Sequence, residues 1–482
     1  MSDPEMDHSE NAPLPDAEYL KHGTVKHRLA HGKHLRKKVP LESHAAHVAG
    51  PDRSDPVSIL EAQATARLPD LIPIRYGRMA ASAFAFYRGG AAIMAADLSV
   101  TPISGLRAQL CGDAHLVNFG MFETPERRLI FGLNDFDETL PGPIEWDVKR
   151  LAASIEIAGR DMGFTQIERR AAVLDSVRAY REAMLEFTEM RNLDVWYAHL
   201  PATDLYTRLD ELADRKSAKE ASKRIEQALR RDHLHAFERL IERTDDGLRF
   251  ASHPPLLTPI DELLDGEQRE RYIEVIQDFL HQYRQSLHVD RRMLMESYRY
   301  IHMARKVVGV GSVGTRAWVV LLLGRDDDDP VLLQLKEAQQ SVLAPYAGET
   351  TFKSQGRRVI EGQRLMQAAS DHVLGHYRLQ AWDGESHDFY VRQMWDGKAS
   401  IDVAQLTARG LAVYGEACGW TLARGHARSG DRIAMAGYLG VEEVFEQAIA
   451  EFASSYADTN ERDHARLLQA IADGEVTAIS GI

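Results

Sequence analysis

Cysteine and long apolar runs are both scarce in this sequence. Two cysteines in 482 residues cannot form a disulfide framework and are typical of a protein from a reducing compartment. The apolar run at residues 317–323 is much shorter than the about 20 residues that a membrane-spanning helix needs. The N-terminal region has no apolar signal core, so we expect a cytoplasmic protein without membrane contacts.

Basic residues are fewer than acidic ones. The net charge of −14 argues against a protein that coats nucleic acid. Residues 21–38 are the exception, because they contain many Lys, Arg and His side chains and no acidic one. We predict that residues 1–55 form a basic, His-rich and partly disordered tail. The alternative is an arm that binds a polyanion or an acidic patch of the protein itself.

Helical periodicity dominates the rest of the chain, with one β-rich segment inside it. The length suits two or three units of domain size. Apolar residues recur at helical spacing through most of residues 56–305 and again in residues 401–482, whereas residues 306–400 hold several strand-like runs. We therefore predict an α+β fold with a mostly helical large lobe, a small antiparallel β-sheet lobe, and C-terminal helices that pack on the helical lobe.

The first candidate site lies in two short acidic motifs, Cys-Gly-Asp-Ala-His-Leu-Val-Asn at residues 111–118 and Asn-Asp-Phe-Asp at residues 134–137. An Asp five residues before an Asn can accept a hydroxyl proton while the Asn oxygen binds magnesium. These residues are Asp113 and Asn118. Asp135 is then the main metal ligand, and Asp137 binds a second ion or orients the loop.

His115 lies within the first motif, but no second His stands at a zinc-ligand spacing, so we expect it to brace the loop. Cys111 is expected to be a small buried residue rather than a nucleophile. The chain also lacks a Gly-x-Ser-x-Gly elbow, so we predict no serine triad.

The second candidate site is a glycine-rich loop with a lysine beyond it. Glycines let the backbone N–H groups approach a phosphate. A dinucleotide-binding fold needs a helix directly after such a loop, whereas here residues 316–323 and 331–336 predict a β-hairpin. The predicted nucleotide-binding residues are Gly309, Gly311, Ser312, Gly314 and Lys336.

Lys336 lies on the second strand of this hairpin, and strand alternation alone does not decide whether its side chain faces the site. An inward lysine is costly unless anions pair with it. The phosphates of a nucleotide and a glutamate on a nearby helix would be such anions. Glu361, on a helix predicted at residues 354–369, is the first choice and Glu349 the second.

These motifs resemble those of the protein-kinase-like superfamily, in particular its aminoglycoside and choline phosphotransferase branch. The resemblance implies a two-lobed fold, ATP and Mg²⁺. It also implies that Asp113 is the base, that Asn118 and Asp135 are metal ligands, and that Lys336 binds phosphate. Cys111 stands where that branch has His.

The chain as a whole resembles an uncharacterised bacterial family, DUF2252, from about residue 55 to residue 465. That family has no settled activity to lend. The stretches that carry the resemblance are residues 75–79, 84–89, 112–120, 134–138, 309–316, 391–393 and 426–431.

The order of the parts differs from that of kinase-like proteins, which begin with the glycine-rich loop. Here the catalytic and metal motifs come first, so we predict a circular permutation. Residues 389–394 would lead to the hinge, and residues 414–428 resemble the long helix that precedes the catalytic loop. The permutation requires Lys336 and Asp135, which are far apart in the sequence, to meet at one phosphate site.

We therefore expect an ATP- and Mg²⁺-dependent phosphotransferase that acts on a small molecule, with a lean towards a cationic or hydroxylated one. A kinase-like enzyme that modifies a protein or transfers a nucleotidyl group remains an alternative. So do a metal-dependent hydrolase built on the two acidic motifs with His115, and a nucleotide-binding module without turnover. Four residues have open roles, in binding a phosphorylated substrate or in bracing the fold: Arg75, Arg78, Arg88 and His426.

Overall fold

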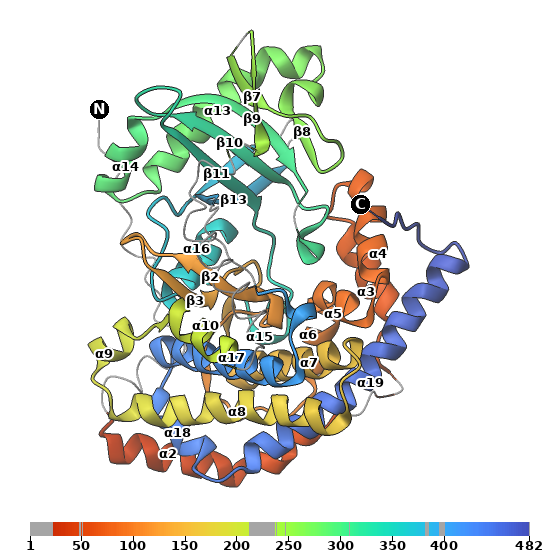
Figure 1. Cartoon of the computed structure of the whole chain (residues 1–482), viewed down its shortest axis with the longest axis vertical. Helices are drawn as coiled ribbons and strands as arrows, with labels where there is room; N and C mark the ends of the chain where they lie inside the picture. The colour runs from red at the N-terminus through yellow and green to blue at the C-terminus, as the bar shows by residue number, and fades with distance from the viewer. Residues whose placement is uncertain are drawn as a thin grey trace.

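The fold is α+β, as predicted, with a large antiparallel sheet at one end of the molecule and long helices stacked at the other (Figure 1). None of the helices in the described residues is long and apolar enough to cross a membrane. This computed structural model describes residues 23–47, 50, 52–211, 237, 239–245, 247–307, 309–380, 385–394 and 401–481.

The large sheet has six strands in the order β12-β13-β11-β10-β9-β8, all antiparallel to their neighbours. The predicted hairpin is β10 and β11, paired from Ala317 opposite Lys336 to Leu323 opposite Pro330. The strands are β8 (Leu257–Pro259), β9 (Arg299–Lys306), β10 (Ala317–Leu323), β11 (Pro330–Glu337), β12 (Gly375–Gln380) and β13 (Ser386–Gln393).

The sheet begins earlier than predicted, because β8 and β9 come from the segment expected to belong to the helical lobe. Strand β9 carries charged residues at both ends and His302 in its middle, so its apolar alternation is weak in the sequence. Its pairing with β10, rather than its own pattern, makes it a strand.

One face of the sheet is covered by α13 (Gly266–Gln285) and α14 (Val289–Glu296). Leu333 and Leu335 of β11 join Phe279 and Tyr283 of α13 in one apolar cluster. The intervening side chains of β11 must point to the opposite face, because successive residues of a strand alternate. This places Gln334 and Lys336 on the side turned towards the rest of the molecule.

The helical end is built around one apolar core that joins two small antiparallel sheets to the long helices. The small strands carry the loops of the two acidic motifs. They are β1 (Arg107–Leu110) with β4 (Leu140–Pro143), and β2 (Phe119–Glu123) with β3 (Leu129–Leu133) and β5 (Leu200–Pro201). The long helices are α7 (Ile144–Asp161), α8 (Gln166–Glu189), α17 (Ala408–Ser429), α18 (Arg432–Leu439) and α19 (Val444–Ala472).

Short helices fill the space between the two ends. The C-terminal segment of the chain packs against α4 (Ile72–Ala80), where the Ile479 N–H donates to the Pro73 carbonyl at 2.8 Å. Other elements are α3 (Pro56–Ala64), η3 (Pro69–Leu71), α4 (Ile72–Ala80), α5 (Ala83–Gly89), α6 (Ala91–Ser99), α9 (Asn192–Tyr197), α10 (Ala202–Asp210), β6 (Ile241–Thr244), β7 (Gly247–Phe250), α15 (Ala344–Ala347) and α16 (Gln355–Met366).

The predicted basic tail is wrong for residues 25–38, which form helix α2 (Val25–Lys38) packed against α18. Arg28 Nε donates to the Asp431 carboxylate at 2.8 Å, and Arg36 Nε donates to the Tyr438 carbonyl at 2.6 Å. The basic side chains that resemble a solvated tail in sequence therefore include partners of the helical core. Residues 1–22 of the predicted tail lie outside the described residues.

Acid should destabilise the fold through His44, which lies in the short helix η2 (Leu41–Ala45). Its side chain is fully buried, and Nε2 lies 2.7 Å from the Tyr438 hydroxyl. Burial and then the charge of Lys149 lower its pKa from 6.5 to about 3. Between these values the unfolded chain binds a proton that the folded chain does not, so stability falls as the pH drops below 6.5.

We expect His44 to remove about 1.4 kcal/mol of stability per pH unit over that window. The measurement is urea unfolding of the wild type and of His44→Gln between pH 7 and pH 4. The variant keeps an amide donor for Tyr438 but has no proton to gain, so its stability should fall less steeply. Equal slopes for the two proteins would contradict the prediction.

Candidate active site

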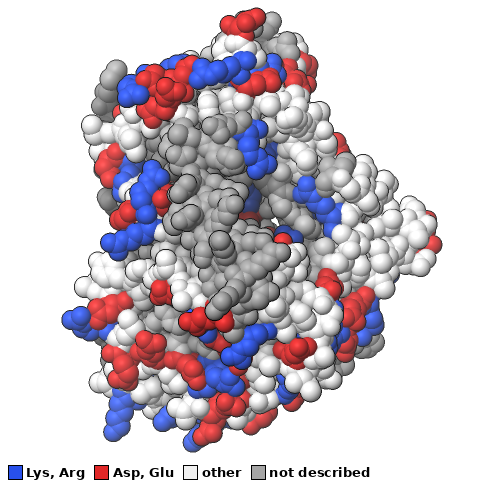
Figure 2. Space-filling view, viewed as in Figure 1, with Lys and Arg blue, Asp and Glu red and all other residues white. Residues whose placement is uncertain are grey.

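The two acidic motifs and the glycine-rich loop line one cavity of about 360 Å³. The face drawn in Figure 2 is hollowed near its middle, and basic side chains border the hollow. Gly314 is absent from the lining; its carbonyl instead accepts a hydrogen bond from the Leu68 N–H at 2.7 Å. The predicted residues that the cavity brings together are Asp113, Asn118, Asp135, Asp137, Gly309, Gly311, Ser312 and Lys336.

Lys336 faces the site and meets both acids of the second motif, 199 and 201 positions away in the sequence. Its Nζ lies 3.1 Å from the Asp135 carboxylate and 2.6 Å from that of Asp137. The Lys336 side chain is 3% exposed, whereas that of Asp135 is 40% exposed. Lys336 and Asp135 are therefore in contact, as the predicted permutation requires.

The charge of Lys336 is set by two opposing effects. Burial alone would lower the pKa of its ammonium group, but the nearby charges of Asp135 and Asp137 outweigh burial and raise the pKa above its ordinary value. The lysine is therefore a fixed positive charge at the inner end of the cavity. An anionic ligand there competes with two carboxylates for the same ammonium group.

Glu361, the predicted partner of Lys336, does not pair with it. The Glu361 carboxylate accepts from Arg364 Nη1 at 2.9 Å and is absent from the cavity lining. Glu349, the second choice, borders a different pocket. Helix α16 instead turns Arg358 inward, where it donates to the Asp137 and Thr139 carbonyls at 2.8 and 2.7 Å.

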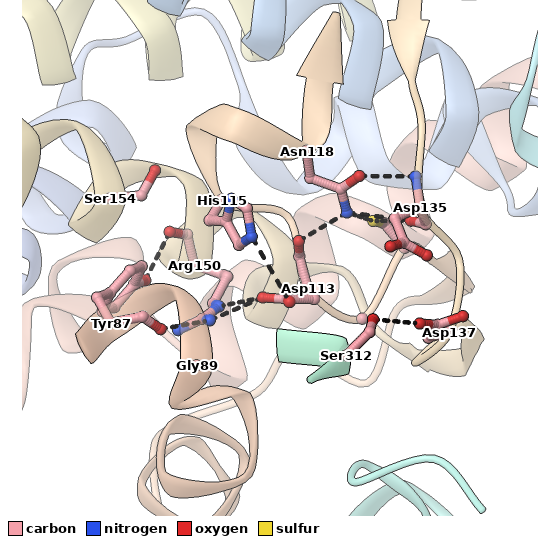
Figure 3. A network of polar contacts seen from close by, with 12 residues as sticks. Tyr87, Gly89, Asp113, His115, Asn118, Asp135, Asp137, Arg150, Ser154 and Ser312 are labelled. Carbon is pink, nitrogen blue, oxygen red and sulfur yellow. Dashed lines mark hydrogen bonds and ion pairs between the residues drawn. The ribbon is translucent and has the colours of Figure 1, made fainter. Parts of the chain in front are cut away.

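The glycine-rich loop connects the antiparallel strands β9 and β10 and lies against the acidic motif. Its short helix η6 (Val310–Ser312) places the Ser312 hydroxyl 3.0 Å from Asp137 Oδ2, to which it donates (Figure 3). The loop, the lysine strand and the acidic motif thus converge on Asp137.

Asp113 is held by a charge-assisted contact. Arg150 of α7 donates from Nε and Nη2 to Asp113 Oδ1 at 2.9 and 2.7 Å (Figure 3). His115 Nε2 lies 3.7 Å from the other carboxylate oxygen. Burial lowers the pKa of His115 to about 4, so the imidazole is neutral near pH 7. The arrangement fixes the direction of the Asp113 carboxylate.

Asn118 connects the two acidic motifs through their backbones. Its Nδ2 donates to the carbonyls of Asp113 and Asp135, both at 3.0 Å, and its Oδ1 accepts from the Asp135 N–H at 2.7 Å. The predicted metal-ligand oxygen is therefore already engaged by a backbone donor. In this arrangement Asn118 positions the two loops, and Asp135 and Asp137 supply the carboxylates.

The first motif is also anchored from behind. Asp147 near the start of α7 accepts from the N–H groups of Cys111 and Gly112 at 2.7 and 3.0 Å. His426 of α17 lies 3.3 Å from Asp147, and the Tyr180 hydroxyl lies 2.9 Å from the other nitrogen of His426. His426, whose role the sequence left open, is thus a buried bracing residue. Burial raises the pKa of the Cys111 thiol well above its usual value, which fits the predicted inert cysteine.

Basic residues line the remaining wall of the cavity. Arg75 and Arg88, left open by the sequence, are in the lining, and Arg78 is not. Arg67 and Arg392 also line it and were not predicted as site residues. Arg67 is a single arginine outside any motif, and the stretch at residues 391–393 carries a family resemblance that assigns no role to Arg392. Arg392 Nη1 donates to the Asn134 carbonyl at 2.9 Å, directly beside the acidic motif.

The carboxylates do not form a metal site of the kind that uses protein ligands alone. No group of three or more His, Cys, Asp and Glu side chains that could hold a metal ion occurs in the described part of the chain. His115 therefore does not join the acidic motifs in such a group.

The sequence model of one protein family matches residues 67–470, which is most of the chain. The family is described as "Uncharacterized protein conserved in bacteria (DUF2252)". No curated protein and no solved structure gives a significant match.

Proposed function

We propose that this chain, which belongs to the DUF2252 family, is a kinase-like phosphotransferase that uses ATP and Mg²⁺. The observation that carries the proposal is the contact of Lys336 with Asp135 and Asp137 beneath the glycine-rich loop. A phosphoryl-transfer site needs a lysine for the phosphates, carboxylates for the metal ion and a backbone-rich loop over both.

The order of strands around the loop supports the proposal. The loop joins β9 to β10, and Lys336 lies on β11, the next strand in both sequence and sheet. Kinase-like sites place the glycine-rich loop and its lysine in this order. A dinucleotide-binding loop would lead into a helix instead.

A contact between β1 and the end of α17 supports the proposed circular permutation of the chain. The Ser429 hydroxyl at the end of α17 accepts from the Gln109 N–H of β1 at 3.1 Å, across 320 positions. Helix α17 therefore ends beside β1, the strand that leads to Asp113. We infer that α17 takes the place of the helix that precedes the catalytic loop in kinase-like proteins, which gives a two-lobed fold with a permuted chain.

The donor set suits magnesium bound together with phosphates. Mg²⁺ favours one or two carboxylates completed by phosphate oxygens and water. Asp135, with its partly exposed carboxylate, and Asp137 would hold the ion, which would neutralise charge on the phosphates. Asp113, on the same cavity, would accept the proton of the attacking hydroxyl.

The alternatives receive less support. A metal-dependent hydrolase would need no Lys336, yet Lys336 occupies both carboxylates of the second motif. A protein-modifying or nucleotidyl-transferring enzyme uses the same nucleotide contacts, and the size of the cavity favours a small acceptor.

The proposal is tested first by ATP binding. Lys336 supplies the only ammonium group among the described residues of the cavity lining. Lys336→Met should weaken ATP affinity about tenfold to a hundredfold, since it removes charge-assisted hydrogen bonds. Affinity is measured by calorimetry and by the thermal shift that a ligand of the folded state produces. Lys353→Met, which changes an exposed lysine outside the cavity, is the matched control.

Asp135→Asn separates the metal from the nucleotide. It should lower ATP affinity in the presence of Mg²⁺ and leave the weaker affinity measured in EDTA unchanged. No thermal shift of the wild type with millimolar ATP and Mg²⁺ would overturn the proposed function.

A further inference from the structure

Three arginines line the same wall of the cavity. Arg67 follows α3, Arg75 lies on α4 and Arg88 lies near the end of α5. The end of α5 also borders the Asp113 side of the site: the Tyr87 carbonyl accepts from Arg150 Nη2 at 2.9 Å, and Figure 3 shows Tyr87 and Gly89 beside the Asp113–Arg150 pair. This wall therefore faces the region where an acceptor hydroxyl would approach Asp113.

Within the described residues, none of these three arginines forms an ion pair with a carboxylate. Arg75 is 1% exposed; its Nη2 donates to Gln63 Oε1 at 3.0 Å and to the Gly89 carbonyl at 3.2 Å. Among the residues that the structure describes, Arg75 Nε and Nη1 find no hydrogen-bond partner, nor do Nε of Arg67 and Nε of Arg88. Arg67 Nη1 donates to the Val313 carbonyl at 2.5 Å.

Two other arginines of this protein pair with carboxylates. Arg150 pairs with Asp113, and Arg53 pairs with both Asp97 and Asp463 at 2.6 Å. The buried Arg358 and Arg424, by contrast, donate only to carbonyl or amide oxygens of described residues.

A buried guanidinium without an anion is costly, because desolvation is not repaid. Burial and the charge of Arg67 lower the pKa of Arg75 to about 9, which still leaves it charged near neutral pH. Among the described residues, the three arginines are thus cations without a direct carboxylate partner beside an open cavity. The charges of Glu138, Glu61 and Asp113 act on Arg67, Arg75 and Arg88 respectively.

We propose that Arg75 and Arg88 bind an anionic group, a phosphate or a carboxylate, on the acceptor molecule. The acceptor is then an anionic hydroxyl compound, and this inference rests on the proposed phosphotransfer. Lys336 and the glycine-rich loop serve the nucleotide. Arg88, whose carbonyl lies next to Gly311 of that loop, lines the same cavity as Asp113 and interacts with its charge. The local charge of the wall, rather than the net charge of −14, sets the sign of the acceptor.

The probe is inorganic phosphate, whose affinity is measured by calorimetry at low salt. Arg88→Gln should weaken phosphate binding about tenfold or more, because a charge-assisted contact is lost. Arg88→Lys should restore part of it, since the charge returns without the planar fork. Arg299→Gln changes an exposed arginine of β9 and should bind phosphate like the wild type.

Measuring ATP affinity as well as phosphate affinity shows whether a variant has lost the nucleotide site or the proposed acceptor site. Arg88→Gln should keep wild-type affinity for ATP with Mg²⁺, and Lys336→Met should keep wild-type affinity for inorganic phosphate. Equal loss of ATP and phosphate affinity in Arg88→Gln would overturn the inference, because the arginines would then hold the nucleotide. If the wild type binds ATP but not inorganic phosphate, the acceptor inference is wrong and the proposed function stands. Absence of ATP binding would overturn the proposed function and the acceptor role with it.

Discussion

Asp113→Asn is expected to bind ATP and Mg²⁺ as tightly as the wild type and to turn ATP over about 10²- to 10⁴-fold more slowly. Loss of a positioned general base has this cost. The substitution keeps the shape of the side chain, and its Oδ1 can still accept from Arg150, whose guanidinium lies 2.7 Å from that atom. Binding and turnover should therefore separate in this variant.

The measurement is ADP release with a mixture of small anionic alcohols as acceptors, alongside calorimetry with ATP. Arg299→Gln serves again as an exposed control outside the cavity. A turnover rate for Asp113→Asn within threefold of the wild type would show that another group takes the proton, and the assignment of the base would be wrong. Loss of ATP affinity in step with turnover would point instead to a disturbed fold.

The acidic motifs and the lysine hairpin could be found in the sequence because each is local. Spacing within a motif fixes which side chains can converge, so Asp113 and Asn118 were recognisable from a loop of a few residues. The inward direction of Lys336 was left undecided, because alternation gives two faces and does not say which is which. That answer came from the apolar cluster of Leu333 and Leu335, which takes the opposite face of β11.

Partners that meet across elements could not be predicted in the same way. The sequence favours Glu361 as a glutamate on the next helix, but a helix has several faces, and α16 turns Arg358 inward instead. The sequence of α2 predicts a tail because its basic residues have no acidic partners within the segment. Asp431, which neutralises Arg28, lies 403 positions away. Both errors concern the direction of a face, which only tertiary packing decides.

Gly112→Ala is expected to be among the most destabilising single changes in the chain, at about 2–5 kcal/mol. Gly112 has φ of +84°, a conformation that costs a residue with a Cβ about 1–2 kcal/mol. A Cβ at this position would also lie 2.2 Å from the Glu138 carbonyl oxygen, which is backbone and cannot rotate away. Relieving that overlap costs about 1–3 kcal/mol more.

Gly105→Ala supplies the matched comparison. Gly105 has φ of +87°, and no atom lies within 4 Å of an added Cβ there. It should therefore lose only the conformational part, and the difference between the two variants in urea unfolding isolates the clash with Glu138. If the two variants lost equal stability, the loop of the first motif would not pack on Glu138 as described. Because Gly112 precedes Asp113 and holds it against the second motif, its replacement should also move the carboxylate away from the position that the proposed proton transfer requires.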